Sequence, residues 1–355
     1  MTTIAVLGAG IMGSALTVPL AENGHDIRVV GTFLDGEIVD SLKANGHHPG
    51  LDLELPDAVR PFHLEEIETA FDGAEVVLSA VNSFGVEWAS EQLSRLLKPG
   101  VDVVAIAKGM QADEDGNLRV LTDVLADQVP DEVSSQVEWC GIVGPSIAGE
   151  VAVRHDTCVV FAGENPERLE RLARLFRTDR YHVWISTDII GAEVGAAMKN
   201  CYALGVGMAA GVQVARGEED SRYRSHNYEA ALFAQGAAEM TQMIDYLGGT
   251  PDVTRVLPSV GDCYVTSAGG RNVKVGKLLG EGVSFQEARE RLGNPTLEGA
   301  AAIQVIGKAI TRLAERGEIG PDDYPLMRHL YEVVGLEQPL DMPWSTFFGG
   351  ESVRV

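Results

Sequence analysis

The chain opens with a short apolar run that breaks into a glycine-rich turn, and this feature constrains its fold most strongly. The run IAVL at residues 4–7 leads into the spacing G-x-G-x-x-G at Gly8, Gly10 and Gly13, and a helix-prone segment starts at Ser14. A strand that ends in such a turn lets the backbone approach a pyrophosphate, while the amides of the next helix face the phosphate oxygens. We therefore expect a dinucleotide site here. The alternative is a turn whose glycines only let strand and helix pack closely.

Apolar runs and amphipathic stretches alternate through the first half of the chain. Short apolar runs predict strands at residues 4–7, 27–30, 75–80, 101–107, 137–143, 157–162 and 182–185. Helical patterns cover residues 11–23, 85–97, 118–125 and 166–176. Strands that alternate with helices pair in parallel, so the sequence predicts an α/β fold with a Rossmann-type doubly wound sheet.

The character of the sequence changes near residue 187. Strand-like runs give way to long helical patterns at residues 189–210, 228–247, 297–316 and 325–334, and the charge-rich stretch 215–226 indicates an exposed loop or insertion. We predict a dinucleotide-binding domain over residues 1–187 and an all-helical substrate and catalytic domain over residues 188–355. A crevice between two such domains is where the reactive ring of a cofactor would meet its substrate.

Composition excludes several classes of protein. The formal net charge of −24 on 355 residues disfavours binding to nucleic acid or to an anionic membrane surface. No apolar stretch approaches the roughly 20 residues of a membrane span, and the first residues lack the basic leader of a signal peptide. The four cysteines are scattered without a C-x-x-C pair. This usage predicts a reduced, cytoplasmic protein without a structural metal.

Two segments that follow predicted strands carry candidate chemical groups. Lys108 comes directly after an apolar run, and active groups in open α/β sheets gather beyond the carboxyl ends of strands. The segment GPSIAGE at residues 144–150 also follows a strand, and its small residues and exposed amides suit an anion or a hydroxyl group. The alternatives are a surface lysine in a turn and an ordinary loop.

Two further segments lie in the helical half. Lys199 and Asn200 stand within an apolar helix. A lysine near apolar walls and a second cation loses affinity for its proton and can then donate and accept it. Asp262 could pair with Lys199, and the guanidinium fork of Arg271 matches a phosphate, with Asn272 as a neutral donor. The alternatives are a lysine on a solvent face and a glycine-rich loop with a structural arginine.

Taken together, these segments resemble the NAD(P)-dependent glycerol-3-phosphate dehydrogenase family over nearly the full length of the chain. The motifs appear in the family's order and spacing: Gly8-x-Gly10-x-x-Gly13, Lys108-Gly109, Gly144-Pro145-Ser146-x-Ala148-x-Glu150, Lys199-Asn200, Gly261-Asp262-x-x-x-Thr266, Arg271-Asn272 and Glu298-Gly299.

The resemblance implies roles for these residues. Lys199 would be the general acid/base, and the catalytic group would be Lys199, Lys108, Asp262, Asn200 and Thr266. The implied cofactor contacts are Gly8, Gly10, Ile11, Met12, Gly13, Phe33, Phe84, Lys108, Ala148, Arg271 and Glu298. The implied substrate contacts are Lys108, Ser146, Lys199, Asp262, Gly270, Arg271 and Asn272. No metal is implied.

The implied activity is reversible hydride transfer between a nicotinamide cofactor and a small phosphorylated polyol, with sn-glycerol 3-phosphate and dihydroxyacetone phosphate as the best candidate pair. After the second predicted strand, no acid stands at the usual ribose-binding place and no arginine is available for a 2′-phosphate, while Asp35 comes slightly late. We expect NAD, with NADP left open. The implied partners are the small substrate and a second copy of the chain in a homodimer.

Three departures from the family pattern keep alternatives open. Val81-Asn82-Ser83 lacks the family's proline, Glu229 replaces a basic residue and Gln235 replaces an arginine, and we expect these changes to fall close to the substrate. A dehydrogenase of a four-carbon ketose or polyol phosphate therefore remains an alternative. A ketopantoate or β-hydroxyacid type of reductase is disfavoured because Lys199 and Asn200 are adjacent. A non-catalytic nucleotide-binding module is disfavoured because the chemical side chains are present.

Overall fold

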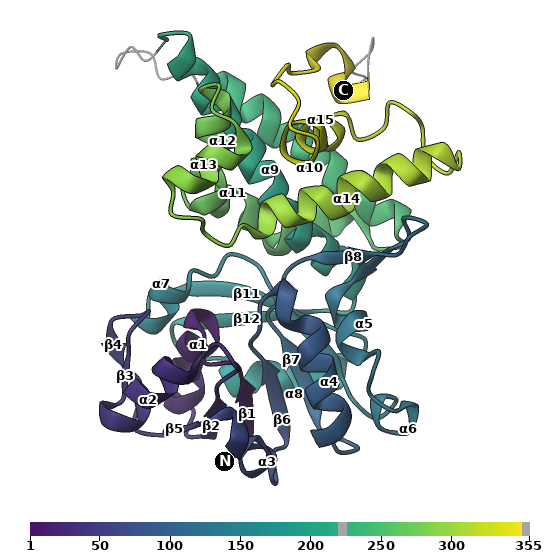
Figure 1. Cartoon of the computed structure of the whole chain (residues 1–355). Coiled ribbons are helices and arrows are strands. Elements are labelled where there is room, and N and C mark those ends of the chain that lie inside the picture. Colours follow the sequence, from purple (N-terminus) through teal and green to yellow (C-terminus); the bar gives the residue numbers. More distant parts are fainter. Residues whose placement is uncertain (219–225, 350–355) are drawn as a thin grey trace. The chain divides into compact units, whose positions relative to one another are not determined.

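The computed structural model describes residues 1–218 and 226–349, and within it the chain forms two compact units (Figure 1). The first unit comprises Met1–Lys108 and Leu121–Ile189, and the second comprises Gly109–Val120 and the chain from Ile190 onward. Most of the charge-rich stretch 215–226 lies outside the described residues. In the described part of the chain, we find no helix with the length and apolar character that crossing a bilayer requires.

The first unit is built on one eight-stranded sheet with the strand order β12-β11-β10-β7-β6-β1-β2-β5. The strands are β1 (Thr3–Leu7), β2 (Asp26–Val30), β5 (Val59–Phe62), β6 (Val76–Ser79), β7 (Asp102–Ala105), β10 (Trp139–Val143), β11 (Thr157–Ala162) and β12 (Tyr181–Ser186). From β1 the chain builds outward through β2 and β5, then crosses to β6 on the other side of β1. The order of strands thus reverses between β1 and β6, which is where doubly wound sheets bind ligands.

Helices cover both faces of this sheet, as the prediction of a doubly wound fold requires. The helices are α1 (Ile11–Glu22), α2 (Gly36–Asn45), α3 (Ile67–Phe71), α4 (Val86–Leu96), α5 (Leu121–Ala126), α6 (Asp131–Ser134), α7 (Ala148–Ala152) and α8 (Pro166–Phe176). Ile4 and Val6 of β1 pack in one core with α1 and α8, whereas Ala5 and Leu7 pack in a second core with α3, α4 and α5. A strand buried on both faces reads as a continuous apolar run, which explains why β1 is visible in the sequence.

The expectation of parallel pairing is wrong at one place, because β11 runs antiparallel to β10. The connection between these strands contains only α7, which has five residues. A helix of that length spans about 7.5 Å, less than half of a strand of about 17 Å, so it is much shorter than the helices that usually return the chain between parallel strands. The chain therefore turns back at the same end of the sheet.

The predicted helix over residues 118–125 is also only partly correct. Leu118–Val120 form strand β9, which pairs with β8 (Met110–Ala112) in a hairpin, and helix α5 begins only at Leu121. The turn of this hairpin packs in the second unit, where a Cβ atom on Gly116 would lie 2.7 Å from the Cβ of Arg312. Residues 109–120 were expected with the first domain, but their packing partners are helices of the second.

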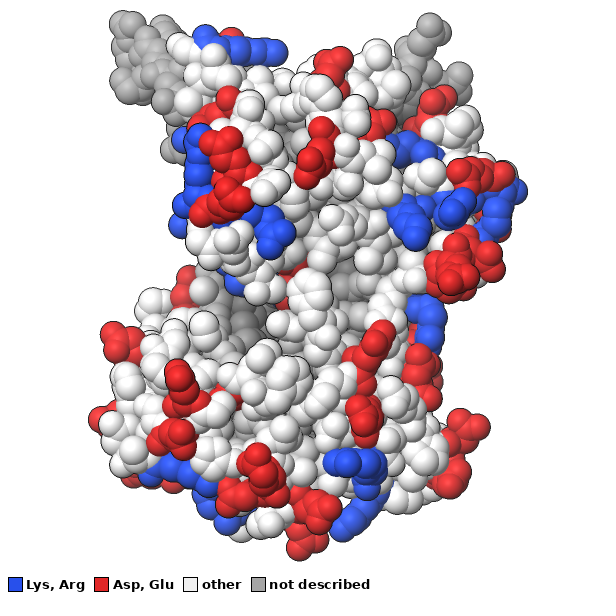
Figure 2. Space-filling model, viewed as in Figure 1, with Lys and Arg blue, Asp and Glu red and all other residues white. Residues whose placement is uncertain are grey.

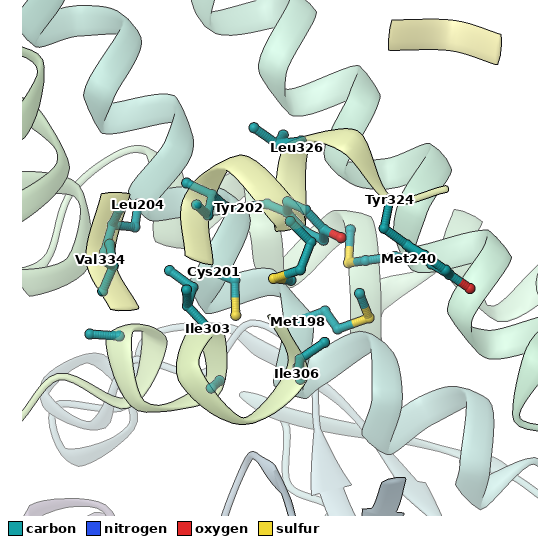
Figure 3. Packing of buried hydrophobic residues seen from close by; sticks show 14 of the residues in the cluster. Met198, Cys201, Tyr202, Leu204, Met240, Ile303, Ile306, Tyr324, Leu326 and Val334 are labelled. Carbon is teal, nitrogen blue, oxygen red and sulfur yellow. The ribbon is translucent and has the colours of Figure 1, made fainter. Parts of the chain in front are cut away.

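The second unit is helical apart from this hairpin in its described residues. Its helices are α9 (Ile189–Ala215), α10 (His226–Tyr246), α11 (Asp262–Ser267), α12 (Arg271–Gly280), α13 (Phe285–Arg291), α14 (Glu298–Glu315) and α15 (Pro325–Gly335). Short 3₁₀ and π turns complete it at Pro251–Arg255, Leu257–Gly261 and Trp344–Gly349. Figure 3 shows Met198, Cys201 and Tyr202 of α9 packed among side chains of α14 and α15. Most residues of α9 are therefore buried against other helices of the second unit.

Close backbone contact between α9 and α12 depends on glycine. A Cβ atom on Gly207 would collide with the carbonyl oxygen of Val273, and one on Gly211 would collide with the carbonyl oxygen of Lys277. In the other direction, a Cβ atom on Gly276 of α12 would collide with the carbonyl oxygen of Leu204 on α9. These glycines let the two helices approach closely enough to bring the first turn of α12 beside the middle of α9.

We predict that Gly211→Ala destabilises the protein by about 1–3 kcal/mol, because the added methyl group must displace backbone rather than a flexible side chain. Gly36→Ala on α2 is the control, since no described atom lies within 4 Å of the added Cβ atom. Urea denaturation of both variants measures the difference. Equal unfolding free energies for the two variants would contradict this account of the helix crossing.

Candidate functional site

The glycine-rich turn after β1 has the shape that a dinucleotide pyrophosphate requires. Gly8 has φ +116° and lies so close to β6 that a Cβ atom would be 2.8 Å from the carbonyl oxygen of Ala80. A Cβ atom on Gly13 would be 2.5 Å from the Cβ of Ala80. Gly10, by contrast, is the N-cap of α1 and has no described atom within 4 Å of its Cβ position. Gly8 and Gly13 thus serve packing, and Gly10 leaves space in front of the helix amides.

The N-terminus of α1 favours an anion. Its first turn contains Ile11, Met12 and Gly13 and no acidic side chain. The unpaired amides and the positive end of the helix dipole at this position attract phosphate oxygens. Residues present in the structure therefore fit the pyrophosphate of a dinucleotide.

Two exposed aromatic rings follow the strands on either side of β1. Phe33 follows β2 with 67% of its surface exposed, and Phe84 follows β6 with 63% exposed. Phe33 packs edge-on against Trp88 with 5.7 Å between ring centroids. The amide of Phe84 donates to Asn82 Oδ1 at 3.1 Å, so Asn82 caps this turn where the family usually has proline. Both rings are therefore largely exposed at the ends of these strands.

Lys108 and the segment 144–150 meet at the ends of neighbouring strands. Lys108 follows β7, and its Nζ donates to the carbonyl oxygen of Gly144, which follows β10, at 3.1 Å. Ala148 begins the short helix α7. The Ser146 hydroxyl oxygen is buried and lies near the Tyr181 phenol, where burial raises the pKa of Tyr181 and the Ser146 hydroxyl partly offsets that rise.

Lys199 forms a buried ion pair in the second unit. Its Nζ donates to Asp262 Oδ1 at 2.6 Å and to Thr266 Oγ1 at 2.9 Å. The Thr266 hydroxyl in turn donates to the Asp262 carbonyl oxygen at 2.7 Å. Lys199 is 7% exposed and Asp262 is 1% exposed. The expected pairing of these two residues is confirmed.

A glycine on α9 allows this arrangement. Gly195 lies one turn before Lys199, and a Cβ atom there would collide with the side chain of Ser259 in the π turn Leu257–Gly261. That turn leads directly into α11, whose first residue is Asp262. The absence of a side chain at Gly195 therefore lets Asp262 stand opposite Lys199.

Asn200 and Asn272 connect this pair to the start of α12. Asn272 Nδ2 donates to Asn200 Oδ1 at 3.4 Å, and Gly299 packs so closely that its Cβ atom would be 2.8 Å from Asn272 Oδ1. Asn272 Oδ1 is buried and makes no hydrogen bond within the described part of the chain. Gly299 follows Glu298, which begins α14 and is half-buried. Long-range contacts thus bring together five predicted site residues: Lys199, Asn200, Asp262, Thr266 and Asn272.

Arg271 is an exposed cation in an unfavourable place for its own helix. It is the first residue of α12, directly after Gly270, which has φ +107°. Among the described residues, no acidic side chain forms an ion pair with it, and a cation at a helix N-terminus is opposed by the helix dipole. Both facts suit a site that receives an anion. Figure 2 shows acidic side chains spread over the visible face, in keeping with the net charge of −24.

Two of the departures from the family pattern, Glu229 and Gln235, have described hydrogen-bond partners outside these groups. Gln235 is buried in α10, where its Nε2 donates to Glu239 Oε1 at 2.8 Å and its Oε1 accepts from the Phe348 amide at 3.0 Å. Glu229 Oε2 lies 3.2 Å from His226 Nδ1. None of these partners is a predicted site residue. Gln235 thus helps to hold the C-terminal segment, and its closeness to the substrate stays a prediction.

Sequence reasoning missed Glu239 and His48. Glu239 is fully buried and accepts hydrogen bonds from Tyr202, Gln235 and the amides of Leu326 and Met327. Burial raises the pKa of its carboxyl group against the effect of these donors. His48 contacts the glycine-rich turn. Neither residue belongs to a local motif, so no signal in the sequence marks it.

Comparison with known proteins supplies the family. A model described as the NAD-dependent glycerol-3-phosphate dehydrogenase N-terminus matches residues 3–169, and the corresponding C-terminal model matches residues 188–343. The chain is 33% identical over 346 residues to an NADP(+)-dependent glycerol-3-phosphate dehydrogenase of Archaeoglobus fulgidus, covering 95% of this chain and 97% of that one. It is 32% identical over 340 residues to a glycerol-3-phosphate dehydrogenase [NAD(P)+] of Lysinibacillus sphaericus, covering 94% and 92%.

A solved structure agrees with these matches. The crystal structure of glycerol-3-phosphate dehydrogenase from Coxiella burnetii superposes with a TM-score of 0.78 at 26% identity, and the match covers 95% of each chain. Both halves of the sequence and the whole fold thus point the same way. The chain belongs to the NAD-dependent glycerol-3-phosphate dehydrogenase family.

Proposed function

We propose that this protein catalyses reversible hydride transfer between NAD(P) and sn-glycerol 3-phosphate, which it interconverts with dihydroxyacetone phosphate. The observation that carries the proposal is the buried Lys199 ammonium, held by Asp262 and Thr266 in a unit that also presents Arg271. Membership of the family and the names of the relatives support the same reaction. We assign cofactor binding to residues 1–187, and substrate binding and catalysis mainly to residues 188–355.

Lys199 is suited to move the proton of this reaction. When bound, the nicotinamide supplies a hydride to the carbonyl carbon in the reducing direction. Negative charge then develops on the carbonyl oxygen, and Lys199 donates a proton to it; in the oxidising direction Lys199 removes the hydroxyl proton. The Asp262 carboxylate and the Thr266 hydroxyl fix the direction of the Nζ atom through bonds of 2.6 and 2.9 Å. Their contacts therefore orient the ammonium before the substrate arrives.

Arg271 and Asn272 are suited to bind the substrate phosphate. A guanidinium group offers two parallel donors to phosphate oxygens, and the first amides of α12 add neutral donors. The left-handed backbone at Gly270 places this helix start without a side chain in front of it. An oriented anion clamp of this kind should contribute to rate as well as to affinity.

NAD is the cofactor we propose, with NADP as the alternative. Asp35 places a carboxylate beside the glycine-rich turn, where its Oδ2 accepts from the amides of Ala9 at 3.2 Å and Thr32 at 2.8 Å. The turn after β2 at residues 31–36 contains no arginine. A negative charge without a neighbouring guanidinium disfavours a 2′-phosphate. The relatives are named as dependent on NADP(+) or NAD(P)+, so both cofactors belong in the test.

We further propose a cytoplasmic homodimer without nucleic-acid or membrane partners. None of the four cysteines forms a disulfide in the described chain, and the net charge is −24. The β5 edge of the sheet contains Pro61, whereas the β12 edge exposes Trp184 and Ile185. An edge strand without proline and with exposed apolar side chains suits contact with a second copy.

A substrate panel tests the reaction. We expect oxidation of NADH with dihydroxyacetone phosphate at a kcat/KM at least about 10-fold above that with four-carbon ketose phosphates, because the relatives are named for glycerol 3-phosphate. The protein should bind NADH more tightly than NADPH. Turnover of a four-carbon ketose phosphate above that of dihydroxyacetone phosphate would replace the proposed substrate.

Removal of the ammonium group tests the proton transfer. Lys199→Ala should lower kcat at least about 100-fold while the Kd for NADH stays within about twofold of wild type. Lys308→Ala on the exposed face of α14 is the control and should retain full activity. Because Lys199→Ala leaves Asp262 buried without its cation, the variant is also made with Asp262→Asn to preserve folding. Near wild-type turnover in a folded Lys199→Ala protein would refute the assignment.

Removal of the guanidinium group tests the phosphate clamp. Arg271→Gln should raise the KM for dihydroxyacetone phosphate about 10–100-fold, as expected for loss of charged hydrogen bonds. Activity with unphosphorylated dihydroxyacetone should be unchanged by the same substitution, and Arg289→Gln serves as the control. An equal loss with both substrates would show that Arg271 does not act on the phosphate.

A further inference from the structure

The two backbone groups of Ala9 in the glycine-rich turn are each held by a side chain from a distant part of the chain. Its N–H donates to Asp35 Oδ2 at 3.2 Å. Its carbonyl oxygen lies 2.9 Å from His48 Nε2, and His48 is fully buried in the short strand β3 (His47–His48). The first bond fixes the Gly8–Ala9 peptide group and the second fixes the Ala9–Gly10 peptide group, so neither can rotate without losing a hydrogen bond.

The backbone decides which nitrogen of His48 carries the proton. The Leu51 amide donates to His48 Nδ1 at 3.1 Å, so Nδ1 must present its lone pair. The single proton of a neutral imidazole then sits on Nε2 and is donated to the Ala9 carbonyl oxygen. Ser14 Oγ donates to the same oxygen at 3.2 Å and is also fully buried. The Ala9 carbonyl group therefore points into the protein.

This orientation matters for the space in front of Gly10. A carbonyl oxygen turned toward that space would repel a pyrophosphate, and Gly10 has no side chain to restrict the backbone next to Ala9. The segment that carries His48 also packs against the start of α1, since a Cβ atom on Gly50 would be 3.1 Å from Ile11 Cγ1 and 3.3 Å from His48 Cε1. His48 thus joins a hairpin to the turn and the helix that face the anion.

We propose that His48 is a positioning residue for the dinucleotide, because its Nε2–H holds the Ala9 carbonyl group inward and keeps Gly10 and the first amides of α1 open to the pyrophosphate. This inference rests on the proposed cofactor binding and adds a residue that acts through Ala9. It assigns the effect to the Nε2 donor and not to the volume of the ring.

Two amide substitutions separate the two nitrogens. In His48→Gln the side-chain amide nitrogen replaces Nε2 and can still donate to the Ala9 carbonyl oxygen. In His48→Asn the shorter side chain reaches only the Nδ1 position, where it can accept from the Leu51 amide. Each variant removes one buried hydrogen bond, so loss of packing alone should affect both in the same way.

The affinity for NADH is measured by fluorescence titration without substrate, together with steady-state kinetics. His48→Asn should raise the Kd and KM for NADH about 10-fold, with kcat and the KM for dihydroxyacetone phosphate within about twofold of wild type. His48→Gln should stay within about threefold of wild type. Equal Kd values for the two variants would overturn the positioning role while leaving the proposed function intact. Failure of the wild-type protein to bind NADH would overturn both.

A second measurement needs no variant. Nitrogen NMR of ¹⁵N-histidine-labelled protein should show His48 protonated at Nε2 and unprotonated at Nδ1. A proton on Nδ1 would contradict the donation to Ala9 and overturn the proposal even if His48→Asn fails to fold.

Discussion

The ion pair between Lys199 and Asp262 is the interaction on which the helical unit is arranged. Burying an ammonium group is costly unless a carboxylate and further hydrogen bonds accompany it, and Asp262 and Thr266 supply both at 2.6 and 2.9 Å. Helix α9 could otherwise be read as a purely apolar core element, because almost all its other buried side chains are apolar or small. Lys199 carries the one ammonium group that α9 buries, and we propose it as the catalytic group. Its partner, Asp262, is the first residue of a separate helix, α11.

Close backbone approach positions the candidate groups in both units. In the first unit, Gly8 and Gly13 press the turn after β1 against β6 and leave the amides of α1 accessible. In the second, Gly207 and Gly211 admit α12 to the surface of α9, and Gly195 admits the π turn that precedes Asp262. Because glycine has no side chain at these places, neighbouring segments can approach closely. This close approach positions the peptide groups and side chains that we propose to bind ligands.

Substitutions that look functional in a sequence can have structural roles. Gln235 replaces the usual arginine of the family, yet it stands beside Glu239, whose carboxyl group is held by amides at the start of α15. Donors from the helix N-terminus and from Tyr202 surround this carboxylate without an arginine. Glutamine at this position therefore has a structural role, since it holds Glu239 and the Phe348 amide.

The sequence by itself determined the buried strands, the glycine-rich turn and the order of the chemical motifs, because apolar runs and fixed spacings are local properties. It even indicated the Lys199–Asp262 pair. The tertiary structure alone decided that β11 runs antiparallel, that Val59–Phe62 forms an edge strand despite Pro61, and that Arg271 begins a helix rather than lying in a loop. It alone brought His48 to Ala9, 39 residues away in the chain. Those outcomes depend on hydrogen bonds and packing between distant segments, and no local pattern of residues encodes them.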